Sequence, residues 1–272
     1  MSASPVVFGI LNITEDSFSD GAKYLAPEAA DARAQELISA GADVLDLGAA
    51  ASNPSAKPVS ADVEIERLAP VVALLKTQGA PVSVDSFSTE VQRWAIAQDV
   101  EYINDVAGFP HAEIYPELAG ARAKLVVMHS VQGGPATPRI HVPPGDILDR
   151  VLMFFEGRLR ALESAGIARE RLIVDPGMGI FLSTDPEASF AMLRAIGRLK
   201  AAFGLPVLFS VSRKSFLRRF LDRGPHEAGA ATLAAEMFAV RQGADYIRTH
   251  DPRALKDALA VTRLLDGPVA LA

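Results

Sequence analysis

The 272-residue chain contains no cysteine, which removes several classes of chemistry at once. Without thiols it can form no disulfide, iron–sulfur cluster or cysteine zinc site, and it has no thiolate nucleophile. A secretion signal is also lacking, because the apolar stretch 5–11 has no basic flank and is too short for a signal sequence or a membrane span. We therefore expect a cytoplasmic protein with no membrane partner.

Positive charge is outnumbered, with 27 Lys and Arg residues against 33 Asp and Glu residues and a formal net charge of −6. Such a chain has no overall attraction for nucleic acid or anionic lipid, so an anionic substrate would have to meet local basic groups. Hydrophobic residues make up 49 % of the chain and charged residues 22 %, which is enough apolar material for a large core. The composition indicates a folded, globular protein.

Polar residues end eight short apolar runs, and this pattern is the most informative feature of the sequence. Strands that are buried on both faces read as continuous apolar runs, and (β/α)₈ barrels gather their active sites where such strands end. That fold typically takes about 250 residues, so the chain suits one barrel domain spanning 1–272. The runs, each with its terminal polar residue, are 8–11 (Asn12), 44–45 (Asp46), 82–84 (Asp85), 102–103 (Asn104), 125–128 (His129), 172–174 (Asp175), 207–211 (Ser212) and 246–248 (His250).

The segments between the runs have the spacing of amphipathic helices. Gly41, Gly166 and Gly204 follow three of them, where a left-handed residue commonly ends a helix. An open doubly wound sheet is the alternative fold, but residues 12–21 lack the glycine-rich dinucleotide fingerprint. The expected helices span 27–40, 62–78, 89–98, 113–119, 147–165, 186–203, 214–221, 226–242 and 252–265.

Three carboxylates and an amide are expected in one barrel mouth: Asp46, Asp85, Asp175 and Asn104. Carboxylates this close repel one another unless they meet donors or a metal, or share protons. A ring rich in N–H groups, such as an aminopyrimidine, would supply the donors. The alternative is that each aspartate caps the helix that follows it, but for the whole set we favour a shared polar site. His129 either faces the same mouth or is a hydrogen-bonded structural residue.

Basic groups gather at the ends of the seventh and eighth runs. Residues 212–215 (Ser-Arg-Lys-Ser) begin a helix, where free N–H groups and cations form an anion site. Arg248 and His250 would converge with them on a pyrophosphate group, and Asn12 would supply an oxygen ligand for Mg²⁺. The alternative is a solvated basic cluster on the surface.

The sequence resembles dihydropteroate synthase over essentially its whole length. That family is similar in fold to the barrel inferred above and is typically dimeric. The resemblance implies that the chain joins 6-hydroxymethyl-7,8-dihydropterin pyrophosphate to p-aminobenzoate, releasing pyrophosphate and forming 7,8-dihydropteroate for folate biosynthesis. The matching segments are 9–14, 16–21, 41–46, 104–106, 127–129, 175–177, 212–216 and 248–251.

The resemblance also implies roles for individual residues. In this family the substitution at the pterin methylene has SN1 character, so it needs electrostatic support and no covalent nucleophile. The pterin would be held by Asp85, Asn104, Met128, Asp175 and Lys214, of which Asp85, Asp175 and Lys214 would be catalytic. Pyrophosphate would meet Asn12, Arg248 and His250, with Asn12 also on Mg²⁺. The p-aminobenzoate would meet Phe18, Pro54 and Ser215, and elements carrying Asp46, Ser17 and Phe18 would close the site.

Three segments depart from ordinary members of the family, and all border the p-aminobenzoate side. Residues 50–54 read Ala-Ala-Ser-Asn-Pro in place of Glu-Ser-Thr-Arg-Pro, residue 15 is Glu in place of Pro, and 178–183 read Met-Gly-Ile-Phe-Leu-Ser in place of a Gly-Phe-Gly-Lys type sequence. This pattern resembles the sulfonamide-insensitive branch carried on mobile resistance elements. We expect Asn53, Ile180 and Phe181 to discriminate sterically against the drug.

Three other functions stay open at this point. The chain could be an ordinary sulfonamide-sensitive synthase, a pterin-binding methyltransferase that serves a corrinoid protein, or a barrel that binds pterin without turnover. A methyltransferase would not need residues 16–18 or 212–215, so these motifs count against it.

Overall fold

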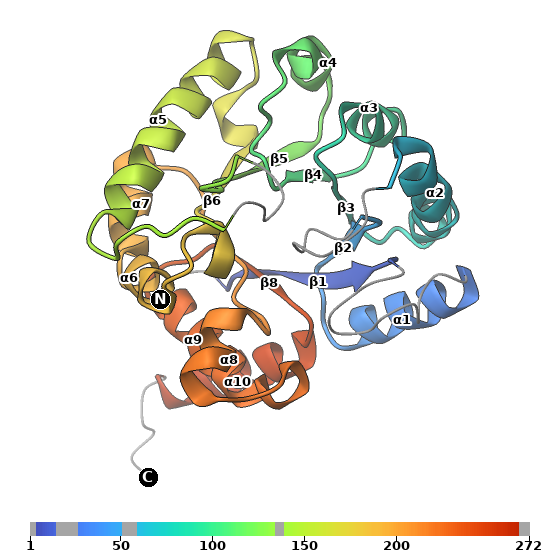
Figure 1. Cartoon of the computed structure of the whole chain (residues 1–272). Coiled ribbons are helices and arrows are strands. Elements are labelled where there is room, and N and C mark those ends of the chain that lie inside the picture. Colours follow the sequence, from blue (N-terminus) through green and yellow to red (C-terminus); the bar gives the residue numbers. More distant parts are fainter. Residues whose placement is uncertain (1–3, 15–26, 51–58, 134–138, 267–272) are drawn as a thin grey trace.

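The computed structural model describes residues 4–14, 27–50, 59–133 and 139–266, and within them eight parallel strands form one sheet in the order β6-β5-β4-β3-β2-β1-β8-β7. The sheet closes on itself, because Val174 and Val207 form a parallel bridge and the Val174 N–H donates to Pro206 O at 3.0 Å. Figure 1 shows this ring with the helices outside it, so the (β/α)₈ barrel is confirmed. The strands are β1 Val6–Asn12, β2 Val44–Gly48, β3 Val82–Asp85, β4 Tyr102–Asp105, β5 Lys124–Met128, β6 Leu172–Asp175, β7 Leu208–Phe209 and β8 Tyr246–Thr249.

The helices follow the strands in alternation. One expected helix, 186–203, is in fact two, because the Ala195 N–H bonds to Met192 O, three residues back, and the chain turns there. The sequence has neither a proline nor a capping side chain at Ala195 that would predict this break. The helices are α1 Pro27–Ser39, α2 Ala61–Thr77, α3 Thr89–Ala97, α4 Tyr115–Gly120, α5 Ile147–Ser164, α6 Pro186–Arg194, α7 Ile196–Phe203, α8 Ser215–Leu221, α9 Gly229–Arg241 and α10 Pro252–Leu265.

Turn geometry agrees with the sequence at the three helix-ending glycines. Gly41, Gly166 and Gly204 have φ angles of 93°, 89° and 63°, a left-handed region in which a side chain is strained. Between β5 and α5, the described residues that follow 138 are held to the loop after β6: Ser183 Oγ bonds to the backbone N–H and C=O of Val142, both at 2.9 Å. No helix in the described part of the chain is both long and apolar enough to span a membrane.

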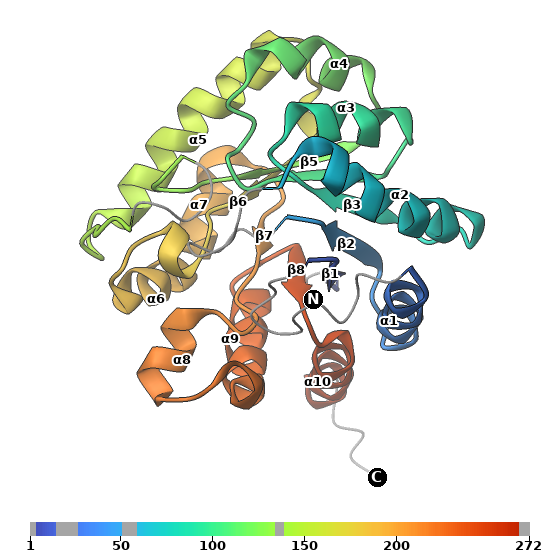
Figure 2. The same ribbon diagram turned by 45° about the vertical axis from the view of Figure 1, so that its right-hand side comes forward.

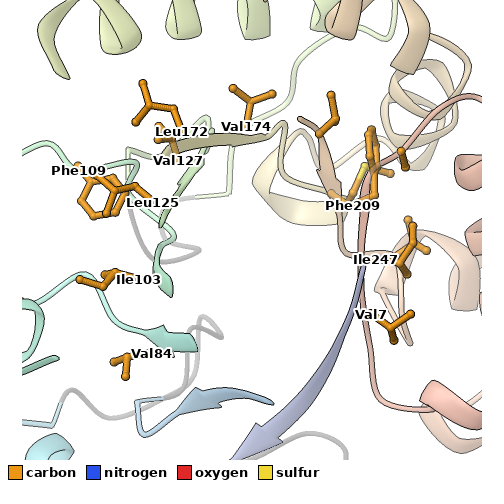
Figure 3. Close-up of a cluster of buried hydrophobic side chains, with 14 of the residues drawn as sticks. Val7, Val84, Ile103, Phe109, Leu125, Val127, Leu172, Val174, Phe209 and Ile247 are labelled. Carbon is orange, nitrogen blue, oxygen red and sulfur yellow. The ribbon is translucent and has the colours of Figure 1, made fainter. Parts of the chain in front are cut away.

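Alternate residues of each strand face the helices or the barrel axis, and the two sets differ in character. The outward set, including Val7, Val84 and Ile247, points toward the helices and builds the main core (Figure 3). An inward cluster holds Phe8, whose ring lies 4.9 Å and 5.7 Å, centroid to centroid, from those of Tyr102 and Tyr246. This apolar cluster fills the N-terminal end of the barrel and leaves the C-terminal end for the site.

Two residues expected at strand ends lie within their strands. β2 continues past Asp46 to Gly48, and β8 continues past Arg248 to Thr249. The prediction of a strand end at Asp46 was therefore wrong, since Leu47 and Gly48, which follow it, still pair with β1 and β3. Both side chains consequently lie inside the barrel, below its mouth, and Asp46 has no exposed surface.

Candidate active site

Arg248 joins two of the expected site carboxylates inside the barrel. Its Nε contacts Asp46 Oδ2, and its second terminal nitrogen donates to Asp85 Oδ2 at 2.7 Å. The Arg248 side chain is only 15 % exposed, so these ion pairs are screened little by water. This arrangement explains how β2 can carry the buried Asp46 beside the partly buried Asp85 of β3: one guanidinium offsets their repulsion.

Asp85, Asn104, Asp175 and Lys214 are brought to the same end of the barrel. Asp85 and Asn104 are paired in register on β3 and β4, while Asp175 ends β6 and Lys214 precedes α8. Burial raises the pKa of Asp175 to about 6, opposed by the Gly177 N–H and by Lys214. Burial and the nearby Arg248 lower the pKa of Lys214 to about 8, opposed by Asp175 and Asp85. Each group is thus electrostatically coupled to its neighbours.

Two oxygens in this region have no hydrogen-bond partner among the described residues: Asn104 Oδ1 and Asp46 Oδ1. Asn104 is only 4 % exposed, and an unpaired acceptor at that depth costs free energy until a donor meets it. Burial also raises the pKa of Asp85, with the Arg248 guanidinium acting against it. The site is therefore rich in acceptors that suit a ligand with several N–H groups.

An apolar wall borders these polar groups. Met128, Val106 and Phe181 form a separate buried cluster, against which the partly buried Phe87 and Ile180 pack. The Lys214 ammonium lies 4.9 Å from the centre of the Phe181 ring, a distance at which a cation and an aromatic face attract. Phe181 is only 5 % exposed, so it belongs to the wall itself and also supports Lys214.

The turn after β6 holds Asp175 in place. Asp175 Oδ1 accepts the Gly177 N–H at 2.8 Å, and Gly177 has φ +71°. A methyl group at Gly177 would stand 2.4 Å from the His129 carbonyl oxygen, so only glycine fits. The His129 ring supports the same turn through Nδ1, which lies 3.0 Å from Pro176 O. With a 2 % exposed side chain and a pKa that burial lowers to about 4, His129 is a structural histidine.

The basic groups expected at the ends of β7 and β8 do gather around His250. Its Nδ1 lies 2.9 Å from Ser212 Oγ, and its backbone carbonyl accepts a bond from Arg33 at 3.0 Å. Burial and the nearby Arg213, Arg248, Lys214 and Arg33 place its pKa well below the usual value. Arg33 was missed by the sequence reasoning, because its place on α1 beside β8 follows only from closure of the barrel.

The helix that begins at Ser215 is short. α8 has seven residues, too few for a full helix dipole, and its Lys214 cap makes no side-chain capping bond. Positive charge at this end of the barrel therefore comes from side chains. Ser215 itself lies beside the β6 loop, since a methyl group at Gly179 would be 3.7 Å from Ser215 Oγ.

Asn12 lies beside Asp85 above β2. A methyl group at Gly48 would stand 3.4 Å from Asn12 Oδ1 and 3.9 Å from Asp85 Oδ2, so the missing side chain leaves room beside both oxygens. Among the described residues, no group of three or more His, Asp and Glu side chains could hold a metal. A metal here would therefore depend on oxygens that a substrate brings.

Asp105, the neighbour of Asn104, is a structural residue that the sequence reasoning did not single out. Its carboxylate accepts the N–H groups of Ala107 at 2.7 Å and Phe109 at 3.0 Å, and Gln92 donates to it at 2.9 Å. These bonds anchor the loop that follows Asn104. The expected residues Ser17, Phe18, Asn53 and Pro54 lie outside the described part of the chain.

Comparisons with known proteins agree with this geometry. The family model described as "Pterin binding enzyme" matches residues 8–250. The chain is 56 % identical to dihydropteroate synthase type-2 of Escherichia coli, over 97 % of each chain. Among solved structures, it is similar to the Xanthomonas albilineans dihydropteroate synthase with 4-aminobenzoic acid, with a TM-score of 0.87, 36 % identity and coverage of 97 % and 94 %.

A further solved structure is the dihydropteroate synthase of Yersinia pestis with a sulfonamide drug, with a TM-score of 0.88 and 30 % identity, covering 96 % of this chain and 94 % of that one. Fold, site and sequence thus lead to the same family. The chain belongs to the dihydropteroate synthases, the pterin-binding enzymes of the (β/α)₈ barrel fold.

Proposed function

We propose that the chain condenses 6-hydroxymethyl-7,8-dihydropterin pyrophosphate with p-aminobenzoate. The p-aminobenzoate nitrogen forms a bond to the pterin methylene carbon, the carbon–oxygen bond to pyrophosphate breaks, and the leaving pyrophosphate keeps the electron pair. The amine then loses a proton, which gives 7,8-dihydropteroate. The observation that carries the proposal is one barrel mouth with unpaired acceptors on one side and four cations around His250 on the other.

The pterin end of the substrate matches the acceptor side of the mouth. Asp175 and Asn104 supply buried oxygens to ring N–H groups, and the apolar side chains of Met128 and Val106 suit the flat faces of the ring. Lys214, with its ammonium above Phe181, adds a donor at the same place. Cationic character that develops at the methylene is stabilised by Asp85 and Asp175 while they are ionised.

The leaving group matches the basic side. We assign the departing pyrophosphate to Arg248 and His250, with Arg213 and Arg33 adding positive charge nearby. Arg248 also pairs with Asp46 and Asp85. Binding of pyrophosphate then adds a third anion to a guanidinium that is already held in position.

Mg²⁺ is proposed as the cofactor, with Asn12 as its protein ligand. The residues fit such an ion, because Asn12 Oδ1 and Asp85 Oδ2 both border the space above Gly48. Mg²⁺ commonly takes one or two protein oxygens and completes its shell with water and substrate phosphates. When bound, it would neutralise charge on the departing pyrophosphate.

Asn12→Ala should raise the Mg²⁺ concentration needed for half-maximal turnover several-fold and leave the KM for p-aminobenzoate unchanged, because only one protein ligand of the ion is lost. Turnover measured across a Mg²⁺ titration, with chelator-treated enzyme as the starting point, checks this. An unchanged Mg²⁺ dependence in the variant would remove Asn12 from the metal site.

The pH dependence of kcat/KM for the pterin substrate should be bell-shaped, with an acid limb between about pH 6 and pH 7 and an alkaline limb near pH 8. As the pH falls, Asp85, whose pKa burial raises to about 7, and then Asp175, whose pKa burial raises to about 6, gain protons, and above pH 8 Lys214 loses its charge. Because the phosphates of the substrate also titrate, variants are needed to assign each limb of the pH profile to a residue. Lys214→Arg should move the alkaline limb upward, because a guanidinium stays protonated. An alkaline limb that stays in place in Lys214→Arg would contradict the assignment.

We further propose that the enzyme is insensitive to sulfonamides. Its identity is 56 % with the type-2 enzyme of E. coli but only 30 % with the Y. pestis enzyme that was crystallised with a sulfonamide drug. The sequence 178–183, which departs from ordinary members, forms the turn that carries Ile180 and Phe181. A bulky side chain there can reject the part of a drug that extends beyond p-aminobenzoate.

Phe181→Ala should lower the sulfonamide Ki far more than it changes the KM for p-aminobenzoate, because removing a clash gains more than a lost contact costs. Phe87→Ala is the matched control, since Phe87 packs in the same cluster from the β3 side. Inhibition constants for wild type and both variants check this. Equal shifts of Ki and KM in Phe181→Ala, or a Phe87→Ala effect as large, would exclude Phe181 as the discriminating residue.

As for partners, we propose small-molecule substrates and a homodimer. Large apolar side chains are exposed on α8 and α10: Phe220 is 74 % exposed, Leu264 83 % and Leu265 77 %. Figure 2 shows α8, α9 and α10 along one side of the barrel. A second copy of the chain that covers these side chains would remove apolar surface from water.

A turnover assay with the purified protein tests the proposed function. With both substrates and Mg²⁺, 7,8-dihydropteroate and pyrophosphate should appear in equal amounts. A protein that binds the pterin but releases neither product would be a binding barrel, which would overturn the proposal.

A further inference from the structure

The buried Ser212 and the partly buried His250 form a pair where β7 and β8 lead into their loops. Ser212 Oγ accepts the backbone N–H of His250 at 3.2 Å and lies 2.9 Å from the ring nitrogen Nδ1. The Ser212 side chain is almost completely buried. One hydroxyl therefore contacts both the backbone and the ring of the same histidine.

The hydroxyl proton can be placed by counting acceptors. Ser212 Oγ already accepts the His250 N–H, and within the described residues it makes no bond other than these two. If Nδ1 carried a proton, the Ser212 hydroxyl would accept two hydrogen bonds, and its own proton would have no acceptor. A buried donor left unpaired is costly, so the hydroxyl donates to Nδ1. The ring proton then sits on Nε2.

The loop after β7 is built to hold Ser212 in this place. Arg213, the next residue, has φ +56°, and its N–H donates to Thr232 Oγ1 on α9 at 3.1 Å. This left-handed conformation is uncommon for a residue with a side chain and needs support from its surroundings. Thr232 anchors the loop and, among the described residues, makes no hydrogen bond to His250, which makes it a natural control.

We propose that Ser212 is a positioning residue that fixes the tautomer of His250, so that a neutral imidazole presents its Nε2–H to the departing pyrophosphate. The inference rests on the proposed function, because the pyrophosphate site at His250 is part of it. Nε2 has no hydrogen bond within the described residues and is the ring nitrogen left for a ligand. The other tautomer would turn a lone pair toward phosphate oxygens, which repel it.

The surroundings of His250 make the tautomer matter. Burial and the cations of Arg213, Arg248, Lys214 and Arg33 lower the pKa of His250 well below its usual value, so the ring is neutral in the free enzyme. Only a neutral ring has one donor and one acceptor nitrogen, and which is which is decided by the partner of the other nitrogen. Ser212 is that partner.

The tautomer can be measured directly in the ligand-free protein by ¹⁵N NMR of the histidine rings, with the His250 signals assigned by their loss in His250→Gln. Wild type should show the Nε2–H form. Ser212→Ala should give a mixture of tautomers, while Ser212→Thr, which keeps the hydroxyl, should restore the wild-type form. Thr232→Val should keep the wild-type form, although it loosens the same loop. A pure Nε2–H ring in Ser212→Ala would overturn the inference.

The effect on the anion is measured by calorimetry with inorganic pyrophosphate and Mg²⁺. Ser212→Ala should bind pyrophosphate up to about tenfold more weakly, the worth of one neutral hydrogen bond, and Ser212→Thr should recover most of that loss. Equal binding by wild type and Ser212→Ala would overturn the inference, as would equal losses in Ser212→Ala and Thr232→Val. His250→Ala separates the two proposals: if it binds pyrophosphate as wild type does, the anion site of the proposed function fails, whatever the tautomer.

Discussion

Arg248→Met should lower the free energy of unfolding by about 3–5 kcal/mol and remove turnover. The substitution keeps the length of the side chain but leaves Asp46, which has no exposed surface, and Asp85 without their cation. An uncompensated buried charge is among the most costly changes in a protein interior. Urea denaturation of both proteins, followed by circular dichroism, measures the loss of stability.

Two further variants make this test specific. Arg122→Met removes an exposed arginine that pairs with Asp99, and it should change stability by no more than about 0.5 kcal/mol. Adding Asp46→Asn to Arg248→Met removes one of the stranded charges and should recover part of the stability but no turnover. If Arg248→Met unfolds at the same urea concentration as Arg122→Met, the buried ion pairs do not hold the barrel mouth together.

Asp175→Asn should weaken binding of the pterin substrate by about 1–3 kcal/mol, or roughly 5- to 150-fold. The amide oxygen of asparagine can still accept the Gly177 N–H, so the turn after β6 keeps its shape. The amide nitrogen then replaces the second carboxylate oxygen, so that an N–H donor of asparagine faces an N–H donor of the pterin ring. Calorimetry with 6-hydroxymethyl-7,8-dihydropterin pyrophosphate, in the absence of p-aminobenzoate, measures the effect.

Asp185→Asn is the matched control for this substitution. Asp185 lies ten residues further along, and its carboxylate caps α6 by accepting the Glu187 N–H at 2.9 Å. Asparagine is an equally good helix cap, so both stability and pterin affinity should be unchanged. Wild-type affinity in a folded Asp175→Asn protein would show that Asp175 does not contact the pterin.

The position of the site could be predicted from the sequence because it depends on local patterns. Short apolar runs that end in Asp85, Asn104 and Asp175 are sufficient to place these side chains at one end of a parallel barrel. The same reasoning placed Asp46 at the end of β2, although the strand continues to Gly48. A polar residue inside a barrel strand interrupts an apolar run in the same way as a polar residue at its end.

What could not be predicted depends on contacts between strands far apart in the chain. The pairing of Arg248 with Asp46 and Asp85 joins residues 202 and 163 positions apart and follows from the closure of β1 on β8. Arg33 reaches His250 across 217 positions for the same reason. The hydroxyl of Ser212 is a similar case, since serine in a basic loop gives no sign of which side chain it will meet.

A crystal structure with 6-hydroxymethyl-7,8-dihydropterin pyrophosphate and Mg²⁺ tests the proposed substrate site most directly. The pterin ring should lie against Met128 and Val106, with its N–H groups toward Asp175 and Asn104. The pyrophosphate should lie between Arg248 and His250, with the metal near Asn12. A pterin in this pocket with pyrophosphate at strand ends other than β8 and β1, or density only at the N-terminal end of the barrel, would contradict it.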